Sequence, residues 1–464
     1  MMDLMMYIPI VTSSILLVLS SIGVLYLDNG KREGYLAAFW LTVSVMLVSL
    51  LIFLYSLLTG NYNYALFSST LYITPFGYFI SISSLLASII VIIGGQQELE
   101  NWDTRSSFLS LILLTNIGVI YLVFSYNVLT ILASWGIASA ATYVIAFLSK
   151  DYNSTESGVK YLIMGILSSS LMIIGLAFYV LGINSLSLDA TVSYPLLVYT
   201  GILFFSIAFL FKIGAFPFQG WLPEVYSMAS RVSVAFVSSV GKIVGLAPLI
   251  VLLYYLKPQG DLGAIVFIVF VIITLSSLIF GNISAFSRKE LASMLAYSSI
   301  TQVGFMLIAI SMIPYNISLA IDSLSVYILA YSIAQAGLFL GVSHIEKVSG
   351  TSSYEGLNGL ASADKTLAFS MAILLLSLLG IPPIVGFWAK LFVLESSFSQ
   401  PWLTLIGFIN SAISAGYYIP PIREMFKEGR FEMVESSERD GVIVASILSI
   451  ILGIIAPLIL GVLT

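Results

Sequence analysis

The sequence contains no cysteine and only one histidine among its 464 residues. Without thiolates, the chain itself cannot ligate an iron–sulfur cluster, attach a haem covalently or form a disulfide. The missing cysteines also leave the redox compartment undefined. A single histidine makes no metal site, and His344, near the end of an apolar run, is expected at the boundary between membrane and water. We therefore expect this chain to bind no metal or redox cofactor of its own.

Charged residues are also scarce. They make up 9% of the chain, whereas hydrophobic residues make up 59%, and average soluble domains are about one-quarter charged. This composition predicts an integral membrane protein that is surrounded by lipid and does not bind nucleic acid. No basic segment precedes the first apolar run, so we expect that run to be a membrane helix and not a cleaved signal peptide.

Apolar runs separated by short polar breaks follow one another along the whole chain. A helix needs ~20 apolar residues to cross a bilayer. The runs cover residues 7–27, 35–58, 74–94, 106–124, 127–148, 159–182, 195–228, 232–256, 264–284, 291–312, 318–343, 366–398, 402–422 and 441–463. We therefore predict an all-α polytopic membrane protein with about 14 transmembrane helices.

The basic residues indicate how these helices are oriented. Of the 18 lysines and arginines, three lie inside apolar runs, and only Lys257 lies in a loop on the same side as the N-terminus. All the others lie in or beside loops on the opposite side. Because lysine and arginine accumulate in cytoplasmic loops, that side is predicted to be cytoplasmic and both termini to lie outside.

Two runs, 195–228 and 366–398, are longer than one straight crossing requires and share a Gly-x-x-Pro-x-x-Gly pattern. The pattern comprises Gly214, Pro217 and Gly220 in the first run, and Gly380, Pro383 and Gly386 in the second. Proline removes a backbone donor and clashes with the preceding turn. Each run is therefore predicted to be one crossing made of two half-helices.

The recurrence of this pattern indicates an internal repeat of five helices, spans 4–8 and spans 9–13. Five is an odd number, so the second copy must enter the membrane from the opposite side, which makes an inverted repeat with broken helices 7 and 12. The predicted parts are residues 1–105 for helices 1–3, 106–258 for the first repeat, 259–430 for the inverted second repeat and 431–464 for helix 14.

Three lysines lie deep inside the predicted spans: Lys212, Lys242 and Lys390. A lysine at mid-membrane costs ~2.5–3.5 kcal/mol on insertion scales, and a lysine beside a broken helix is typical of an ion or proton path. Burial disfavours the charged form of lysine, so each could lose and regain a proton. The alternatives are extension of Lys212 or Lys390 to the membrane surface, and a structural pair with a carboxylate for Lys242.

Two carboxylates lie near the predicted outer face. Asp322 is at the start of span 11, and Glu395 is at the end of span 12, beyond Lys390. They could form an outer proton exit, or they could be solvated acids at the membrane interface.

Three motifs together resemble the antiporter-like membrane subunits of respiratory complex I, which are relatives of multisubunit Na⁺/H⁺ antiporters. The motifs are Phe-Lys-Ile-Gly-Ala-Phe-Pro-Phe-Gln-Gly-Trp around Lys212, Leu-Ala-Tyr-Ser-Ser-Ile-Thr-Gln-Val-Gly-Phe at 295–305, and Gly-Ile-Pro-Pro-Ile-Val-Gly-Phe-Trp-Ala-Lys at 380–390. Because a lysine follows Gly-Phe-Trp, the third motif is most similar to that of the NADH-quinone oxidoreductase subunit N family.

This resemblance implies fourteen helices and proton translocation driven by quinone reduction in partner subunits. Quinone and iron–sulfur clusters would then be held by other subunits of the membrane arm and its attachments. The resemblance assigns a proton relay to Lys212, Lys242 and Lys390, and places the chain in the cell membrane of a prokaryote.

The sequence departs from the resembled pattern at three positions. Gly136 stands where the family carries a helix 5 glutamate that pairs with the helix 7 lysine, and Gln219 and Gln302 stand where histidines are usual. Lys212 therefore lacks its expected counter-ion. Two other functions stay open: a subunit of a cation/proton antiporter, and a structural spacer whose proton channel has decayed.

Overall fold

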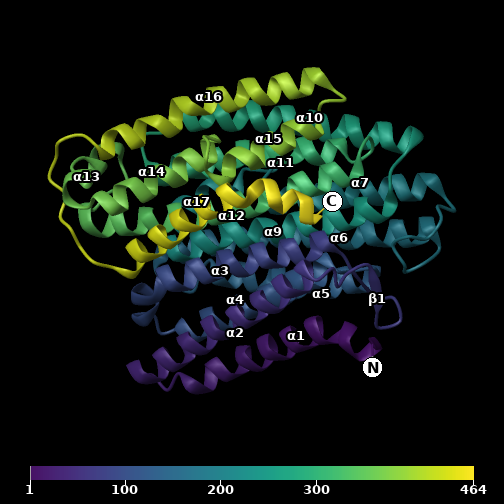
Figure 1. Ribbon diagram of the computed structural model, residues 1–464, viewed down its shortest axis with the longest axis horizontal. Helices are drawn as coiled ribbons and strands as arrows, with labels where there is room; N and C mark the ends of the chain where they lie inside the picture. Colours follow the sequence, from purple (N-terminus) through teal and green to yellow (C-terminus); the bar gives the residue numbers. More distant parts are fainter. Residues whose placement is uncertain (1, 464) are drawn as a thin grey trace. The chain divides into compact units, whose positions relative to one another are not determined.

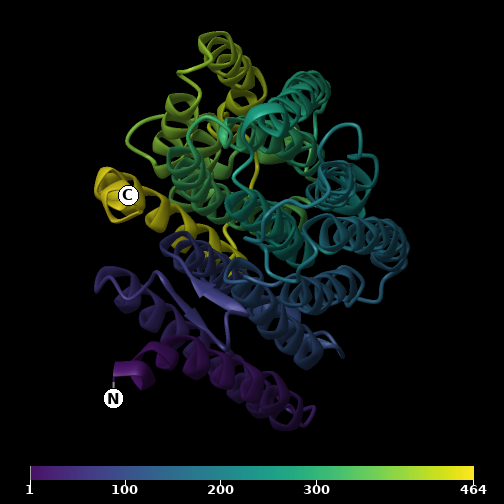
Figure 2. The same ribbon diagram turned by 90° about the vertical axis from the view of Figure 1, so that its right-hand side faces the viewer.

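The computed structural model describes residues 2–463, and nearly all of them are helical (Figure 1). The chain divides into two compact units. Unit 1 comprises Met1–Ile89, Glu100–Ile213 and Val240–Leu262, and unit 2 comprises Ile90–Leu99, Gly214–Ser239 and Gly263–Thr464. Within each unit the long helices lie alongside one another, as an antiparallel membrane bundle requires (Figures 1 and 2).

Unit 1 holds the N-terminal helices and a small hairpin. Its elements are α1 (Met2–Leu27), α2 (Arg32–Leu58), β1 (Tyr64–Leu66), β2 (Leu71–Ile73), most of α3 (Pro75–Glu100), α4 (Arg105–Val123), α5 (Val128–Ile145), α6 (Tyr152–Ile183), α7 (Pro195–Ile213) and the second part of α9 (Arg231–Leu256). The two strands pair antiparallel and appear as arrows in Figure 2.

Unit 2 holds most of the remaining helices. They are α8 (Trp221–Met228), most of α10 (Gly260–Phe286), α11 (Leu291–Met312), α12 (Ile317–Ser349), the 3₁₀ helix η1 (Tyr354–Leu357), α13 (Leu360–Ala363), α14 (Lys365–Leu379), α15 (Val385–Ser396), α16 (Pro401–Met425) and α17 (Ser437–Leu463). Helices α11 and α12 lie at the centre of this unit, because almost every residue along their apolar segments is buried.

The observed helices confirm the predicted fold class. In the part of the chain that the structure describes, 13 helices are long and apolar enough to cross a membrane, and α14 is a shorter apolar helix. Helices α7 and α8 occupy the first overlong run, and α14 and α15 occupy the second. The hairpin, η1 and α13 lie in polar connections, where no hydrophobic period indicated an element.

Polar side chains fix several helix starts. Asn127, Asp151, Asn316 and Asp364 each accept a hydrogen bond from a backbone N–H in the first turn of α5, α6, α12 and α14. These groups satisfy donors that the helix itself leaves unpaired. The short polar breaks in the sequence therefore define where each membrane helix begins.

Both predicted helix breaks are present. Helix α7 ends at Ile213 and α14 ends at Leu379, and the next residues, Gly214 and Gly380, have φ of 70° and 91°. Only glycine adopts this left-handed conformation without strain from a Cβ atom. Gly380 also donates its N–H to carbonyls in the last turn of α14, as a C-terminal cap does.

The matching glycines at the far ends of the two breaks have different surroundings. A Cβ atom on Gly386 would overlap the backbone carbonyl of Ser377, whereas a Cβ on Gly220 would have no other atom within 4 Å. Gly386→Ala is therefore expected to destabilise the subunit by about 1–3 kcal/mol, since overpacking forces the backbone apart. Gly220→Ala is the matched control and is expected to be nearly neutral. Heating membranes and recording the temperature at which the subunit aggregates would test both. Equal midpoints for the two variants would contradict the tight contact at Gly386.

Ion pairs join helix ends within each unit. In unit 1, both guanidinium edges of Arg105 bind Asp28, at 2.8 and 2.9 Å. The hydrogen bonds from Arg105 hold the pKa of Asp28 below its ordinary value, although burial of the carboxyl group opposes this shift. In unit 2, Arg231 binds Glu346 in the same two-pronged way, also at 2.8 and 2.9 Å.

Lys347 forms ion pairs with two carboxylates of unit 2. Its ammonium lies 2.9 Å from Glu98 on α3 and also binds Glu438 on α17. His344, one turn earlier on α12, is buried, and its Nδ1 lies 2.8 Å from the hydroxyl of Ser436. These contacts fasten three helices from distant parts of the sequence at one end of the unit.

Candidate functional site

The three lysines predicted from the sequence are all buried inside helices. The exposed fractions of Lys212, Lys242 and Lys390 are 3%, 2% and 5%. None of them therefore extends to the surface of the chain, which excludes the surface-reaching alternative for Lys212 and Lys390. A buried ammonium is tolerated only where hydrogen bonds or other polar groups replace its water.

Lys212 lies in the last turn of α7, one residue from the break. Its ammonium donates a hydrogen bond to the Thr142 hydroxyl at 2.9 Å. It also lies 3.9 Å from the ring centre of Tyr143 and 4.9 Å from that of Tyr161. Among the described residues no carboxylate forms an ion pair with Lys212.

Gly136 faces away from the interior of the chain. It is exposed, and a Cβ atom built on it would meet no other atom within 4 Å. Thr142, which binds Lys212, is six residues further along α5, or about 9 Å along the axis and about 120° around it. A side chain at position 136 therefore cannot bond directly to the ammonium in the arrangement seen here.

Gly136→Glu is accordingly expected to leave the action of Lys212 unchanged in those complexes that assemble. The new carboxyl group would enter the membrane at a cost of ~2.5–3.5 kcal/mol on insertion scales, so less subunit should assemble. The measurement is protons moved per electron pair in vesicles, normalised to assembled subunit, with Gly136→Ala as the control. A changed ratio per assembled complex would show that position 136 does reach the relay.

Lys242 lies on the face of α9 that contacts the stem of Lys212. A Cβ atom on Gly245, one turn further along α9, would lie 3.0 Å from Cγ of Lys212. Residues three apart on a helix share a face. Lys212 and Lys242 are therefore carried on adjoining faces of α7 and α9 in unit 1.

Lys390 is bound to the helix break of unit 2. Its ammonium donates to the backbone carbonyl of Leu379, the last residue of α14, at 3.0 Å, and to the Ser411 hydroxyl at 3.1 Å. The ring centre of Phe305 lies 4.5 Å away. The break frees the Leu379 carbonyl from helical pairing, and the negative end of the helix dipole favours a cation there.

The sequence did not indicate this common placement of two lysines at half-helix C-termini. Lys212 closes α7, and Lys390 folds back onto the end of α14. Lys390 is eleven residues from Leu379, so only the folded break brings them together. The Gly-x-x-Pro-x-x-Gly pattern was the available signal, because it marks where carbonyls lose their helical donors.

A polar network borders Lys390. The amide nitrogen of Gln302 donates to the Leu378 carbonyl at 3.0 Å and to the Tyr418 hydroxyl at 2.8 Å, and its oxygen accepts from Tyr327. A small cavity of about 10 Å³ lies between these groups. Its lining includes Gln302, Tyr327, Tyr331, Ser377, Gly386 and Lys390. Such a volume is about enough for one water molecule.

The two candidate exit carboxylates are not joined to Lys390. Asp322 is 6% exposed and Glu395 is exposed. Neither forms an ion pair or a side-chain hydrogen bond among the described residues. The described residues also contain no group of three or more histidines or acids that could hold a metal ion.

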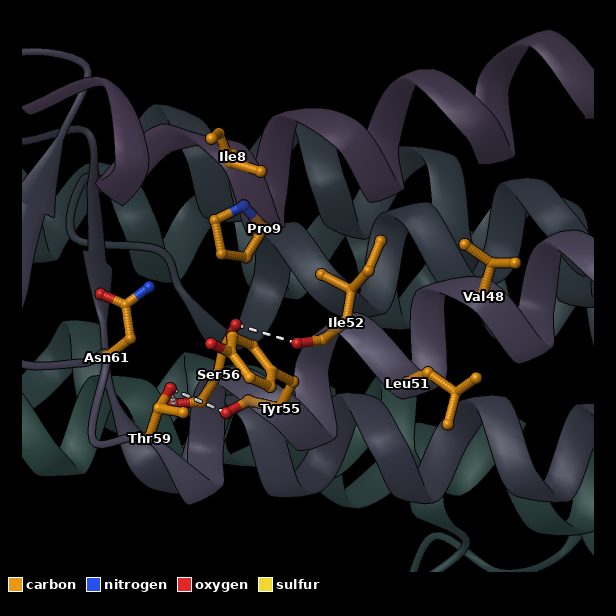
Figure 3. Close-up of a pocket in the computed structure, with 9 residues that line it drawn as sticks. All are labelled: Ile8, Pro9, Val48, Leu51, Ile52, Tyr55, Ser56, Thr59 and Asn61. Carbon is orange, nitrogen blue, oxygen red and sulfur yellow. Dashed lines mark hydrogen bonds between the residues drawn. The ribbon is translucent and has the colours of Figure 1, made fainter. Parts of the chain in front are cut away.

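A larger cavity lies elsewhere, between α1 and α2 (Figure 3). It has a volume of about 650 Å³ and is lined by Ile8, Pro9, Val48, Leu51, Ile52, Tyr55, Ser56, Thr59 and Asn61. The hydroxyls of Ser56 and Thr59 are bound to carbonyls of their own helix. None of these described lining residues is a carboxylate, a lysine or a histidine.

The chain is similar in sequence to one family of membrane proteins and in fold to several solved structures. The family described as NADH:quinone oxidoreductase/Mrp antiporter, TM, matches residues 125–414. NADH-quinone oxidoreductase subunit N of Desulfitobacterium hafniense is 28% identical over 462 residues, covering 93% of this chain and 91% of that protein. Subunit N 2 of Hydrogenobaculum sp. is 37% identical over 324 residues, covering 68% of each.

The solved structures agree on the fold. A chain of respiratory complex I from Thermus thermophilus superposes with a TM-score of 0.81 at 22% identity, over 97% of this chain and 98% of that chain. At this level of identity the likeness concerns the arrangement of helices.

Proposed function

Because this chain belongs to the NADH-quinone oxidoreductase subunit N family, within the larger family of NADH:quinone oxidoreductase and Mrp antiporter membrane subunits, we propose that it translocates protons in a complex I-like quinone oxidoreductase. It acts as one membrane subunit of the enzyme and carries no redox site itself. Quinone reduction in partner subunits supplies the energy. The observation that carries this proposal is the set of three buried lysines, two of which occupy the ends of broken half-helices.

The proposed relay runs through Lys212, Lys242 and Lys390. An ammonium held by a hydroxyl or a carbonyl can release a proton and remain hydrogen-bonded as a neutral amine, which still has two N–H donors. The adjoining faces of α7 and α9 support transfer between Lys212 and Lys242. Asp322 and Glu395 are proposed as weaker candidates for the outer exit.

The proposed topology divides the chain at residues 105, 258 and 430. Residues 106–258 and 259–430, the predicted spans 4–8 and 9–13, form two repeats of opposite orientation. Residues 1–105 and 431–464, the predicted spans 1–3 and 14, lie outside them. Both termini lie on the outer side of a prokaryotic cell membrane. The two similar breaks, α7–α8 and α14–α15, support the repeat, and the one-sided distribution of basic residues supports the orientation.

The proposed partners are the other membrane-arm subunits of the same enzyme. The relatives named above are described as subunits of NADH-quinone oxidoreductase. Because this chain has no cysteine, iron–sulfur clusters must be carried by those partners.

A structural spacer is the second candidate. The hydrogen bond of Lys212 to a neutral hydroxyl, and the glutamines at positions 219 and 302 where the family usually has histidines, favour it. A Na⁺/H⁺ antiporter subunit is the third, because the matching family includes the Mrp antiporter.

One experiment separates these functions. The purified complex is reconstituted into vesicles, supplied with electron donor and quinone, and its proton movement is recorded with and without Na⁺. We expect proton movement that follows electron transfer, does not require Na⁺, and yields fewer protons per electron pair when Lys212 is replaced by alanine. An unchanged ratio in Lys212→Ala would support the spacer, and proton movement that requires a Na⁺ gradient would support the antiporter.

A further inference from the structure

We propose that a neutral cage of one hydroxyl and two aromatic rings replaces a carboxylate as the partner of Lys212, and that Thr142, Tyr143 and Tyr161 are therefore positioning residues of the relay. This inference rests on the proposed function. The three side chains come from two helices, since α5 supplies Thr142 and Tyr143 and α6 supplies Tyr161. All three lie in unit 1 with Lys212.

The hydroxyl of Thr142 is oriented to accept a hydrogen bond from Lys212. It donates its own hydrogen to the carbonyl of Ser139 at 2.9 Å. A lone pair therefore remains for the ammonium of Lys212, whose nitrogen lies 2.9 Å away. The hydrogen bonds form a short chain from lysine to hydroxyl to backbone carbonyl.

The two rings supply the second part of the cage. A cation within about 6 Å of a ring centre is attracted by the negative face of the ring, and more strongly where water is excluded. Tyr143 and Tyr161 meet this distance, at 3.9 and 4.9 Å. Their ring centres are 4.9 Å apart and their planes are at 90°, so each ring supports the other.

Two further features indicate that the ring of Tyr143, and not its hydroxyl, is what the site uses. The hydroxyl is buried and has no hydrogen-bond partner among the described residues. A Cβ atom on Gly165 of α6 would overlap the ring, so only glycine at that position lets the ring reach the ammonium.

A neutral cage has a chemical consequence. If the partner were a buried carboxylate, release of the lysine proton would leave an unpaired anion, which is strongly unfavourable in a buried site. With a hydroxyl and two rings, release of the proton leaves every group neutral. Lys212 can therefore complete a protonation cycle without a second charge on α5.

The test is a set of variants in the assembled complex, each measured as protons moved per electron pair and normalised to assembled subunit. Tyr143→Leu removes the ring. The fall in its ratio is expected to be at least half of the fall seen in Lys212→Ala. Tyr143→Phe keeps the ring and is expected to restore the loss. Tyr152→Leu is the matched control, because Tyr152 is the first residue of α6 and its side chain is 81% exposed.

A double variant distinguishes a cage from mere packing. If Tyr143 acts through Lys212, Tyr143→Leu should lower the ratio no further once Lys212 is alanine. Thr142→Val, with Thr142→Ser as its conservative partner, provides the same test if Tyr143→Leu fails to assemble. A parent-like ratio in both Tyr143→Leu and Thr142→Val, equal losses in the Leu and Phe variants, or additive losses in the double variant would each overturn the cage.

Failure of the cage and failure of the proposed function give different results. If the cage alone is wrong, Lys212→Ala and Lys242→Ala lower the ratio but Tyr143→Leu does not. If the proposed function is wrong, both lysine variants keep the parent ratio.

Discussion

Lys242→Ala is expected to remove the share of proton translocation carried by this subunit, while electron transfer in the absence of a gradient changes much less. Lys242 is the most deeply buried of the three lysines, at 2% exposed. It lies on the face of α9 that adjoins the stem of Lys212, and alanine offers no group that could hold or pass a proton.

The measurement is the ratio of protons to electron pairs in vesicles, with the rate of electron transfer to quinone recorded separately after adding an uncoupler. Lys257→Ala is the matched control, because Lys257 directly follows the same helix and is exposed. We expect the control to retain the parent ratio. A parent-like ratio in Lys242→Ala would remove this residue from the relay.

Lys390→Glu is expected to lower both assembly and pumping. The ammonium of Lys390 donates to the Leu379 carbonyl and the Ser411 hydroxyl, whereas an ionised carboxylate has no donor and would face that carbonyl. It would also place a negative charge at the C-terminus of α14, where the helix dipole opposes it. A lost hydrogen bond to a charged group is worth about 1.5–3 kcal/mol, so the break should loosen.

Lys365→Glu provides the control, because Lys365 lies at the opposite end of α14 from the carbonyl that Lys390 binds. Lys365 is exposed in the first turn of α14, and a negative charge there is favoured by the helix dipole. We expect Lys365→Glu to assemble like the parent and Lys390→Glu to be depleted from the purified complex and to acidify vesicles poorly. Equal assembly and equal acidification by the two variants would show that Lys390 neither caps α14 nor carries protons.

The helix positions and the breaks could be predicted because each depends on local chemistry. Hydrophobic runs, helix-starting polar residues and the glycine–proline pattern act within a few residues of one another. The runs 195–228 and 366–398 are therefore predicted as interrupted crossings from the sequence alone, and α7–α8 and α14–α15 confirm them.

The partners of the lysines could not be predicted, because they depend on how each helix is rotated about its axis. Nothing local indicates that Thr142 faces Lys212 while Gly136 faces outward. A motif comparison naturally identified Gly136 as the lost counter-ion position. It could not indicate that a hydroxyl and two rings further along α5 and α6 surround the ammonium.

The ion pairs of Lys347 also bear on how the chain is made. They join Glu98, on α3, to Glu438, at the start of α17, which is synthesised much later. Glu438 is almost fully buried, and α17 contacts the second break through Gly453, which lies against the backbone of Pro383. These contacts of unit 2 therefore cannot form until α17 has entered the bilayer beside α3 and α12. Until then, Lys347 can pair with Glu98 but not with Glu438, so insertion of α17 is the step that completes this group of ion pairs.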